Sequence, residues 1–152
     1  MAESTEEDAR SEPPIEIESD RADLDAERGI SIYSGDAVLS RGPLRITGDV
    51  MEVYTDPDGA LQRVVVEGNP ATYHDHPEGL AEPVRGEAQT MEYFASAPER
   101  AALRGAARLW QGQDEITGET IDIDLERQLV EARGDESRRA RTVLYPARRE
   151  DR

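Results

Sequence analysis

The residue types best able to do chemistry are few in this chain and lie together in one short segment. His74, Asp75 and His76 include both of its histidines, and imidazole and carboxylate groups are common zinc ligands. Proline and glycine flank the segment, and no further ligand follows at a spacing typical of a metal site. We therefore interpret these residues as part of a solvated loop and predict no bound metal.

Carboxylates are the other candidate group, because 34 aspartates and glutamates could hide the pair that glycosidases use. Most of them alternate with apolar residues, which is typical of the solvated face of a strand. The chain also lacks cysteine and contains no nucleophile elbow, P-loop or dinucleotide-binding fingerprint. The sequence thus predicts neither a catalytic centre nor a cofactor.

Charge restricts the partners of this protein. Its 18 basic residues are all arginines, and the net charge is −16. Such a chain repels nucleic acids and anionic membrane surfaces, so we expect no nucleic-acid partner. No apolar run approaches the roughly 18 residues that span a bilayer, and residues 1–12 lack the apolar core of a signal peptide. Two locations stay open: the cytoplasm, or the periplasm after removal of a signal peptide.

A repeat organises the chain into two copies about 70 residues apart. Residues 35–39 (GDAVL) align with residues 105–109 (GAARL), and residues 46–53 (ITGDVMEV) align with residues 116–123 (ITGETIDI). Each copy reads as a strand, a turn and a second strand. Two copies of one hairpin predict a stacked β-architecture in which each unit buries its apolar face against the next.

The elements that must position any site are therefore short strands, and the fold class is all-β. Residues 98–104 have helical propensity by composition, but the repeat aligns Leu103 with Tyr33 in a strand, and we follow the repeat. Gly68-Asn69-Pro70 is expected to end a strand. The expected strands are residues 15–18, 22–25, 30–39, 44–46, 51–54, 61–66, 71–73, 89–94, 106–110, 116–123, 129–132 and 142–145.

Alternation within these strands gives one apolar face. Side chains of a strand point to alternate sides, so Tyr33, Ala37 and Leu39 share a face with Gly35, as their counterparts do in the second copy. After Gly48 the alternation of apolar and polar residues shifts by one position, which a β-bulge would explain. A closed sandwich core and a ligand-lined trough would both produce this pattern, and periodicity alone favours the core.

A likeness over most of the chain favours the trough. Residues 14–20 (PIEIESD), 35–37 (GDA), 68–73 (GNPATY) and 142–146 (TVLYP) occur in the order and spacing of the OstA-like family, which the chain resembles from about residue 14 to residue 146. The resemblance implies an open, twisted β-jellyroll of antiparallel strands, shaped as a V-shaped trough. It also implies a non-enzymatic periplasmic protein that carries lipopolysaccharide between the inner and outer membranes during outer-membrane biogenesis.

Periodicity and the resemblance together indicate which residues would line the trough and hold acyl chains. The candidate lipid-binding residues are Ile15, Ile17, Leu24, Tyr33, Leu39, Ile46, Met51, Val53, Tyr73, Met91, Tyr93, Leu109, Ile116, Ile121 and Ile123. The alternative hypothesis is an OstA-like scaffolding module, such as a separated part of an outer-membrane translocon, that does not itself carry lipid.

We expect three segments: a disordered acidic leader (residues 1–12), the β-jellyroll domain (residues 13–146) and a polar tail (residues 147–152). The resemblance implies lipopolysaccharide, an LptC-like inner-membrane protein and an LptD-like outer-membrane translocon as partners. Exposed edge strands at the two ends predict head-to-tail self-association. The charges expected to steer this contact are Arg138, Arg139 and Arg141 on one copy and Glu16, Glu18 and Asp20 on the next.

Overall fold

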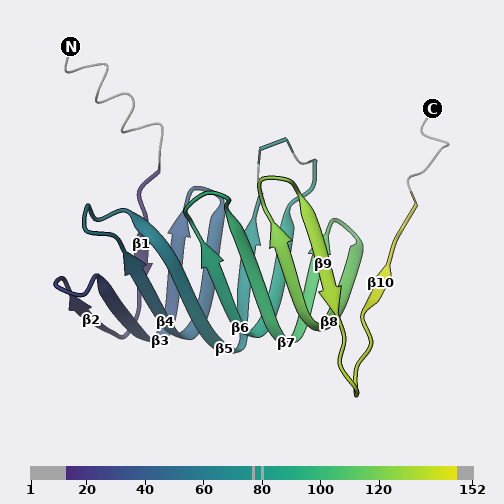
Figure 1. Cartoon of the computed structure of the whole chain (residues 1–152), viewed down its shortest axis with the longest axis horizontal. Helices are drawn as coiled ribbons and strands as arrows, with labels where there is room; N and C mark the ends of the chain where they lie inside the picture. Colours follow the sequence, from purple (N-terminus) through teal and green to yellow (C-terminus); the bar gives the residue numbers. More distant parts are fainter. Residues whose placement is uncertain (1–12, 77, 80, 147–152) are drawn as a thin grey trace, which may run out of the picture.

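The computed structural model describes residues 13–76, 78–79 and 81–146, and its regular structure is a single antiparallel sheet (Figure 1). The described residues contain no helix, which agrees with the expected fold class. The strands are β1 (Glu16–Glu18), β2 (Arg21–Asp25), β3 (Ile30–Arg41), β4 (Leu44–Thr55), β5 (Leu61–Asp75), β6 (Val84–Phe94), β7 (Arg100–Gln111), β8 (Asp114–Asp124), β9 (Leu129–Arg133) and β10 (Arg141–Val143).

Strands β3 to β8 pair in sequence order, and each edge of the sheet is a strand split in two. At the N-terminal edge, β1 and β2 pair with different halves of β3. At the C-terminal edge, β10 and β9 pair with different halves of β8. The two edges lie at opposite ends of the long axis of the molecule (Figure 1). Each edge therefore has its own unpaired backbone groups.

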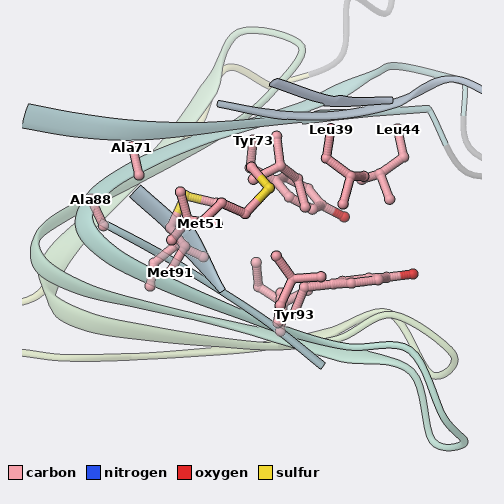
Figure 2. Close-up of a cluster of buried hydrophobic side chains, with 14 of the residues drawn as sticks. Leu39, Leu44, Met51, Ala71, Tyr73, Ala88, Met91 and Tyr93 are labelled. Atoms are coloured by element: carbon pink, nitrogen blue, oxygen red, sulfur yellow. The ribbon is translucent and has the colours of Figure 1, made fainter. Parts of the chain in front are cut away.

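The sheet folds back on itself along one line, which we call the corner. Every central strand pair has a register shift there, and the gap in each split edge strand falls at the same level. Half of each strand lies in one layer, with β1 and β10, and half lies in the other, with β2 and β9. Figure 2 shows the layers above and below the buried side chains, meeting near Ala71 and Ala88.

The two repeats form the corner in the same way. In β3 the residues between Ser34 and Ala37 are a bulge, and Gly35 and Asp36 there have φ angles of 87° and 46°. Gly105 and Ala106 of β7 match them with φ angles of 88° and 48°. Such left-handed backbone favours glycine and bends a strand. The repeat and the bulge expected beside Gly48 are therefore confirmed, although both glycines lie half-buried at the corner and not inside the trough.

Several expected strand ends were wrong for the same reason. β5 continues from Leu61 to Asp75 through Gly68-Asn69-Pro70, where its register with β6 shifts between Glu67 and Ala71. These residues bend the strand at the corner and do not end it. β6 likewise starts earlier than expected, at Val84. β7 includes Leu103, as the repeat predicted and as local helical propensity did not.

The core lies between the two layers and is apolar throughout. Its buried members come from both halves of β4 to β7 and from one half each of β3 and β8, whose other halves contribute the half-buried Tyr33 and Ile116. No charged residue is buried in the described part of the chain. The larger fully buried side chains are Tyr73, Leu39, Ile46, Met51, Leu103, Ile121, Val64 and Val66. With few aromatic residues, the sheet encloses a core of aliphatic side chains and two tyrosines.

Candidate apolar trough

Most of the residues proposed from the sequence to line a trough lie on the inner faces of the two layers. The buried ones are Leu39, Ile46, Met51, Val53, Tyr73, Met91, Tyr93, Leu109, Ile121 and Ile123. Ile17, Tyr33 and Ile116 are half-buried and pack against this cluster. Because strand pairing brings them together from seven strands, β1 and β3 to β8, they form one continuous surface.

Two of the proposed residues remain exposed, Ile15 at 38% and Leu24 at 69%. Leu24 has the inward register, since it pairs with Ser31, which pairs with the buried Val53. It is exposed because β2 is the last strand of this layer and nothing covers its far side. Its exposure is therefore a consequence of its place at the edge of the sheet.

The inner face also contains residues that sequence reasoning did not propose for the site. Val64 and Val66 of β5 are fully buried, but they flank Val65 in an unbroken apolar run, so alternation could not assign their side. Leu103 is fully buried, and the repeat could have identified it because it aligns with Tyr33. Ala101, Ala107 and Ala88 complete the surface with small side chains.

The middle of the trough is filled by its own side chains. Tyr73 of β5 and Tyr93 of β6 extend from opposite layers, and both hydroxyl groups point toward the open side, away from the corner (Figure 2). Met51 and Met91 lie between them and the corner (Figure 2). Methionine and aliphatic side chains adapt their packing easily. In this closed state the inner face is a core, and a ligand would have to separate the layers to enter.

At the open side, two tyrosine–carboxylate pairs form what we call the rim. Tyr73 Oη donates a hydrogen bond to Asp75 Oδ2 over 3.2 Å, and Tyr93 Oη donates one to Glu99. Burial raises the pKa of both phenols, and the neighbouring carboxylates raise it further. Burial also raises the pKa of the Asp75 carboxyl, with Glu99 adding to the effect. The tyrosines are thus neutral donors, and each is bonded to a carboxylate of its own layer.

The C-terminal end of the trough has a small apolar opening of about 120 Å³. It is lined by the apolar residues Val84, Leu109, Ile123, Leu125 and Val130, together with Gln111, Asp124 and Gln128. Val130 of β9 is 43% exposed although it pairs with the buried Ile123. Like Leu24 at the other end, it is an inward apolar side chain that the last strand leaves uncovered.

The outer face is polar and paired. Glu92 of β6 accepts hydrogen bonds from Arg63 of β5 and Arg104 of β7, with N–O distances of 3.1 and 2.7 Å. The Arg108 guanidinium similarly contacts Glu115 over 3.0 Å. Exposed pairs of this kind contribute little stability individually. They maintain a hydrated outside against an apolar inside, which is what alternation predicted.

The histidine segment belongs to the end of β5 and the loop after it. His74 is exposed, with its pKa lowered by partial burial and by Arg85 and Arg45. Within residues 13–76, 78–79 and 81–146, no three histidine or carboxylate groups are arranged to hold a metal ion. Among the same residues there is also no helix long and apolar enough to cross a membrane.

Known proteins share both the sequence pattern and the fold of this chain. The family described as "LptA/(LptD N-terminal domain) LPS transport protein" matches residues 16–129. The chain belongs to the LptA/LptD N-terminal domain family. The OstA-like resemblance of the sequence is thereby confirmed.

Individual members of the LptA/LptD N-terminal domain family align along most of their length. Lipopolysaccharide export system protein LptA of Escherichia coli K12 is 32% identical over 140 residues, covering 91% of this chain and 74% of that protein. Lipopolysaccharide export system protein LptH of Pseudomonas aeruginosa is 31% identical over 121 residues, covering 80% of this chain and 69% of LptH. The crystal structure of Pseudomonas aeruginosa LptH, described as the LptA-homologous periplasmic component of a lipopolysaccharide transport device, superposes with a TM-score of 0.80 at 28% identity. The superposition covers 88% of this chain and 96% of the LptH chain.

Proposed function

We propose that this chain is a non-enzymatic periplasmic carrier of lipopolysaccharide that holds the acyl chains between the two layers of its trough. The observation that carries the proposal is the continuous apolar inner face, which reaches both ends of the sheet as the exposed side chains of Leu24 and Val130. Its relatives are named as lipopolysaccharide export proteins. No step requires a catalytic residue or a cofactor.

Loading would require the layers to separate along the rim. The corner is continuous backbone in the central strands β3 to β8, whereas the rim hydrogen bonds of Tyr73 and Tyr93 are each formed within one layer and do not tie the two layers together. Each CH₂ group transferred from water contributes about 0.8 kcal/mol. A chain of a dozen CH₂ groups would thus supply on the order of 10 kcal/mol toward separating the layers. The adaptable Met51 and Met91 would rearrange around it.

Site-specific photo-crosslinking with lipopolysaccharide tests the lipid-binding role. A crosslinker at Tyr93 or at Ile17 should capture the lipid, because both side chains belong to the inner face. The matched control is Glu52, which lies next to Met51 on β4 but points outward, toward Tyr54 Oη. Equal labelling at the three positions would show that the assignment of faces is wrong.

One observation favours the alternative of a scaffolding module that carries no lipid. The inner face is fully packed in the closed state, so the fold is complete without a ligand. Under this alternative none of the three crosslinkers captures lipopolysaccharide, while the edge strands still bind their neighbours. The crosslinking experiment therefore separates the two functions.

The proposed partners in either case are further OstA-like domains: copies of this chain, an LptC-like inner-membrane protein and an LptD-like outer-membrane translocon. The edges have suitable directions for head-to-tail pairing. Strands β3 to β8 alternate, so β2 on β3 and β9 on β8 run in opposite directions, and β9 of one copy could pair antiparallel with β2 of the next. The contact would extend the sheet and repeat without closing.

The register supports this junction. Leu24 and Val130 lie at one level of the inner face, connected by successive paired residues across the whole sheet. The row is Leu24, Ser31, Val53, Val64, Tyr93, Ala101, Ile123 and Val130. A second copy continuing the sheet would bring its Leu24 beside Val130 of the first. Two exposed apolar side chains would then cover each other and make the trough continuous.

Sedimentation velocity over a range of protein concentrations tests the assembly. Wild-type protein should form a distribution of larger species, and Leu24→Asp or Val130→Asp should reduce association because each buries a carboxylate in the junction. Ile32→Asp is the matched control, since Ile32 is an exposed apolar residue on the outer face of β3. A strict monomer, or a closed two-fold dimer, would contradict the head-to-tail arrangement.

A further inference from the structure

Four arginines line a pocket on the outside of the corner at the C-terminal end of this acidic protein. The pocket has a volume of about 590 Å³. Arg108 of β7 lines one side, and Arg138, Arg139 and Arg141 of the segment that enters β10 line the other. We call these last three residues the arginine corner. The chain as a whole has a net charge of −16.

The cations of the pocket are unequally neutralised. Arg108 contacts Glu115 over 3.0 Å and Glu87 over 3.9 Å. Arg139 and Arg141 form no ion pair within 4.0 Å with any residue that the structure describes. The pocket therefore retains two uncompensated guanidinium groups, and an anionic partner can approach them without displacing an existing one.

The turn before β10 holds the arginine corner in position. Asp135 Oδ1 accepts hydrogen bonds from the backbone N–H groups of Ser137 and Arg138, both at 2.9 Å, and from Ser137 Oγ at 3.1 Å. The Asp135 backbone N–H donates to the Arg138 carbonyl over 2.7 Å. The guanidinium groups thus extend from a defined turn, which lowers the entropy lost when a partner binds.

The opposite end of the corner is acidic. Asp20 occupies the gap between β1 and β2, as the turn described above occupies the gap between β9 and β10. Its backbone N–H donates to the Gly35 carbonyl over 2.9 Å, which fixes it against the corner. Asp36 and Asp49 are exposed beside it, in the bulged parts of β3 and β4. We call Glu18 and Asp20 the acidic corner.

The arginine corner and the acidic corner lie at the same level of the sheet. Glu18 of β1 and Arg141 of β10 end one row of paired residues, namely Glu18, Val38, Thr47, Thr72, Glu87, Arg108, Thr117 and Arg141. A second copy that continues the sheet therefore brings its Glu18 beside Arg141. Its Asp20 then lies over the turn that contains Arg138 and Arg139.

We infer that the arginine corner is a socket for the acidic corner of a second copy of this chain. The inference rests on the proposed head-to-tail assembly and adds what gives that assembly its direction. Two N-terminal ends repel each other because each presents an acidic corner, and two C-terminal ends repel each other because each presents an arginine corner. Only the head-to-tail junction pairs Glu18 and Asp20 with arginines.

Two charge-reversal variants test the socket by sedimentation velocity at fixed ionic strength. E18R/D20R makes the head basic, and R138E/R139E/R141E makes the tail acidic; all five side chains are exposed. Each variant alone should associate on the order of tenfold more weakly than wild type, because its head and tail then have the same sign. An equimolar mixture of the two should associate again, since each head matches the other variant's tail.

The head variant separates the socket from general repulsion. E18R/D20R makes the chain less negative overall, so if only net charge governed association, it would associate more strongly than wild type. Association of E18R/D20R at or above the wild-type level, or a mixture that does not recover, overturns the inference. If R138E/R139E/R141E lowers lipopolysaccharide crosslinking at Tyr93 and leaves association unchanged, the pocket takes a phosphorylated headgroup, and the inference is overturned. If wild type is a monomer, the assembly itself fails, whereas crosslinking at Tyr93 tests lipid carriage separately.

Discussion

The two repeats, residues 30–54 and 100–124, have the same backbone path but bury their side chains differently. Met51 and Ile121 are equivalent and both fully buried. Tyr33, however, is half-buried where its counterpart Leu103 is fully buried, and Ile116 is half-buried where its counterpart Ile46 is fully buried.

Position in the stack explains these differences. Tyr33 belongs to the copy beside the N-terminal edge, where the five-residue β2 is its last neighbour on that side. Ile116 belongs to the copy beside the C-terminal edge, where the three-residue β10 is its last neighbour. The repeat therefore determines conformation, and the neighbouring strands determine how much apolar surface is covered.

The largest expected effect comes from positions that the two copies bury equally. Met51→Ala and Ile121→Ala each remove a fully buried side chain and leave a cavity. We expect each to lower the free energy of unfolding by about 2–5 kcal/mol, measured by urea denaturation. A loss below about 1 kcal/mol at either position would show that the layers are not closely packed there.

The bulge glycines provide the next test. Gly35→Ala and Gly105→Ala place a side chain on left-handed backbone, which disfavours each by about 1–2 kcal/mol. A Cβ atom would also meet the Asp20 side chain at 2.4 Å or the Gln89 side chain at 2.5 Å. Gly59→Ala is the control, because Gly59 has a φ angle of 87° with nothing within 4 Å of its Cβ position. Equal losses at the three sites would mean that the corner contacts yield freely.

A smaller difference should separate the equivalent isoleucines. Ile46→Val removes a methyl group from a fully buried site and should lower stability by about 0.5–1.5 kcal/mol. Ile116→Val removes it from a half-buried site, so we expect a smaller loss by the same denaturation measurement. If Ile116→Val is the more destabilising change, burial in the stack does not explain the difference between the copies.

The smallest expected effects on stability come from two titrating residues at the end of β5, between the two copies: Asp75 of the rim and its neighbour His74. The pKa of Asp75 is raised by burial, so the folded state takes up its proton more readily and this group's contribution to stability rises as the pH falls toward 3.8. The pKa of His74 is lowered, so its contribution decreases as the pH falls through 6.5. Asp75→Asn and His74→Ala should therefore change the pH dependence of the melting temperature in opposite directions. Parallel profiles for both variants and wild type would contradict these shifts.

Several features of the fold follow from local sequence. Alternation assigned the inner residues of β3, β4 and β8 because a strand places successive side chains on opposite faces. The repeat assigned Leu103 to a strand against its local helical propensity. Where apolar residues ran without a break, as around Val65, alternation could not assign the side chains to the inner or the outer face. Only the pairing of β5 with β6 made that assignment. The acidic leader and the polar tail fall outside the described residues, so those segments remain predictions.

The amino-acid sequence by itself determined the all-β class, the two copies and most of the inner face, because these depend on periods of a few residues and on identity between the copies. Only the tertiary structure decided that Gly68-Asn69-Pro70 bends a strand and does not end it, since a bulge and a turn use the same residues. It alone also placed Leu24 level with Val130 and Glu18 level with Arg141, because those relations depend on the cumulative register of eight strands.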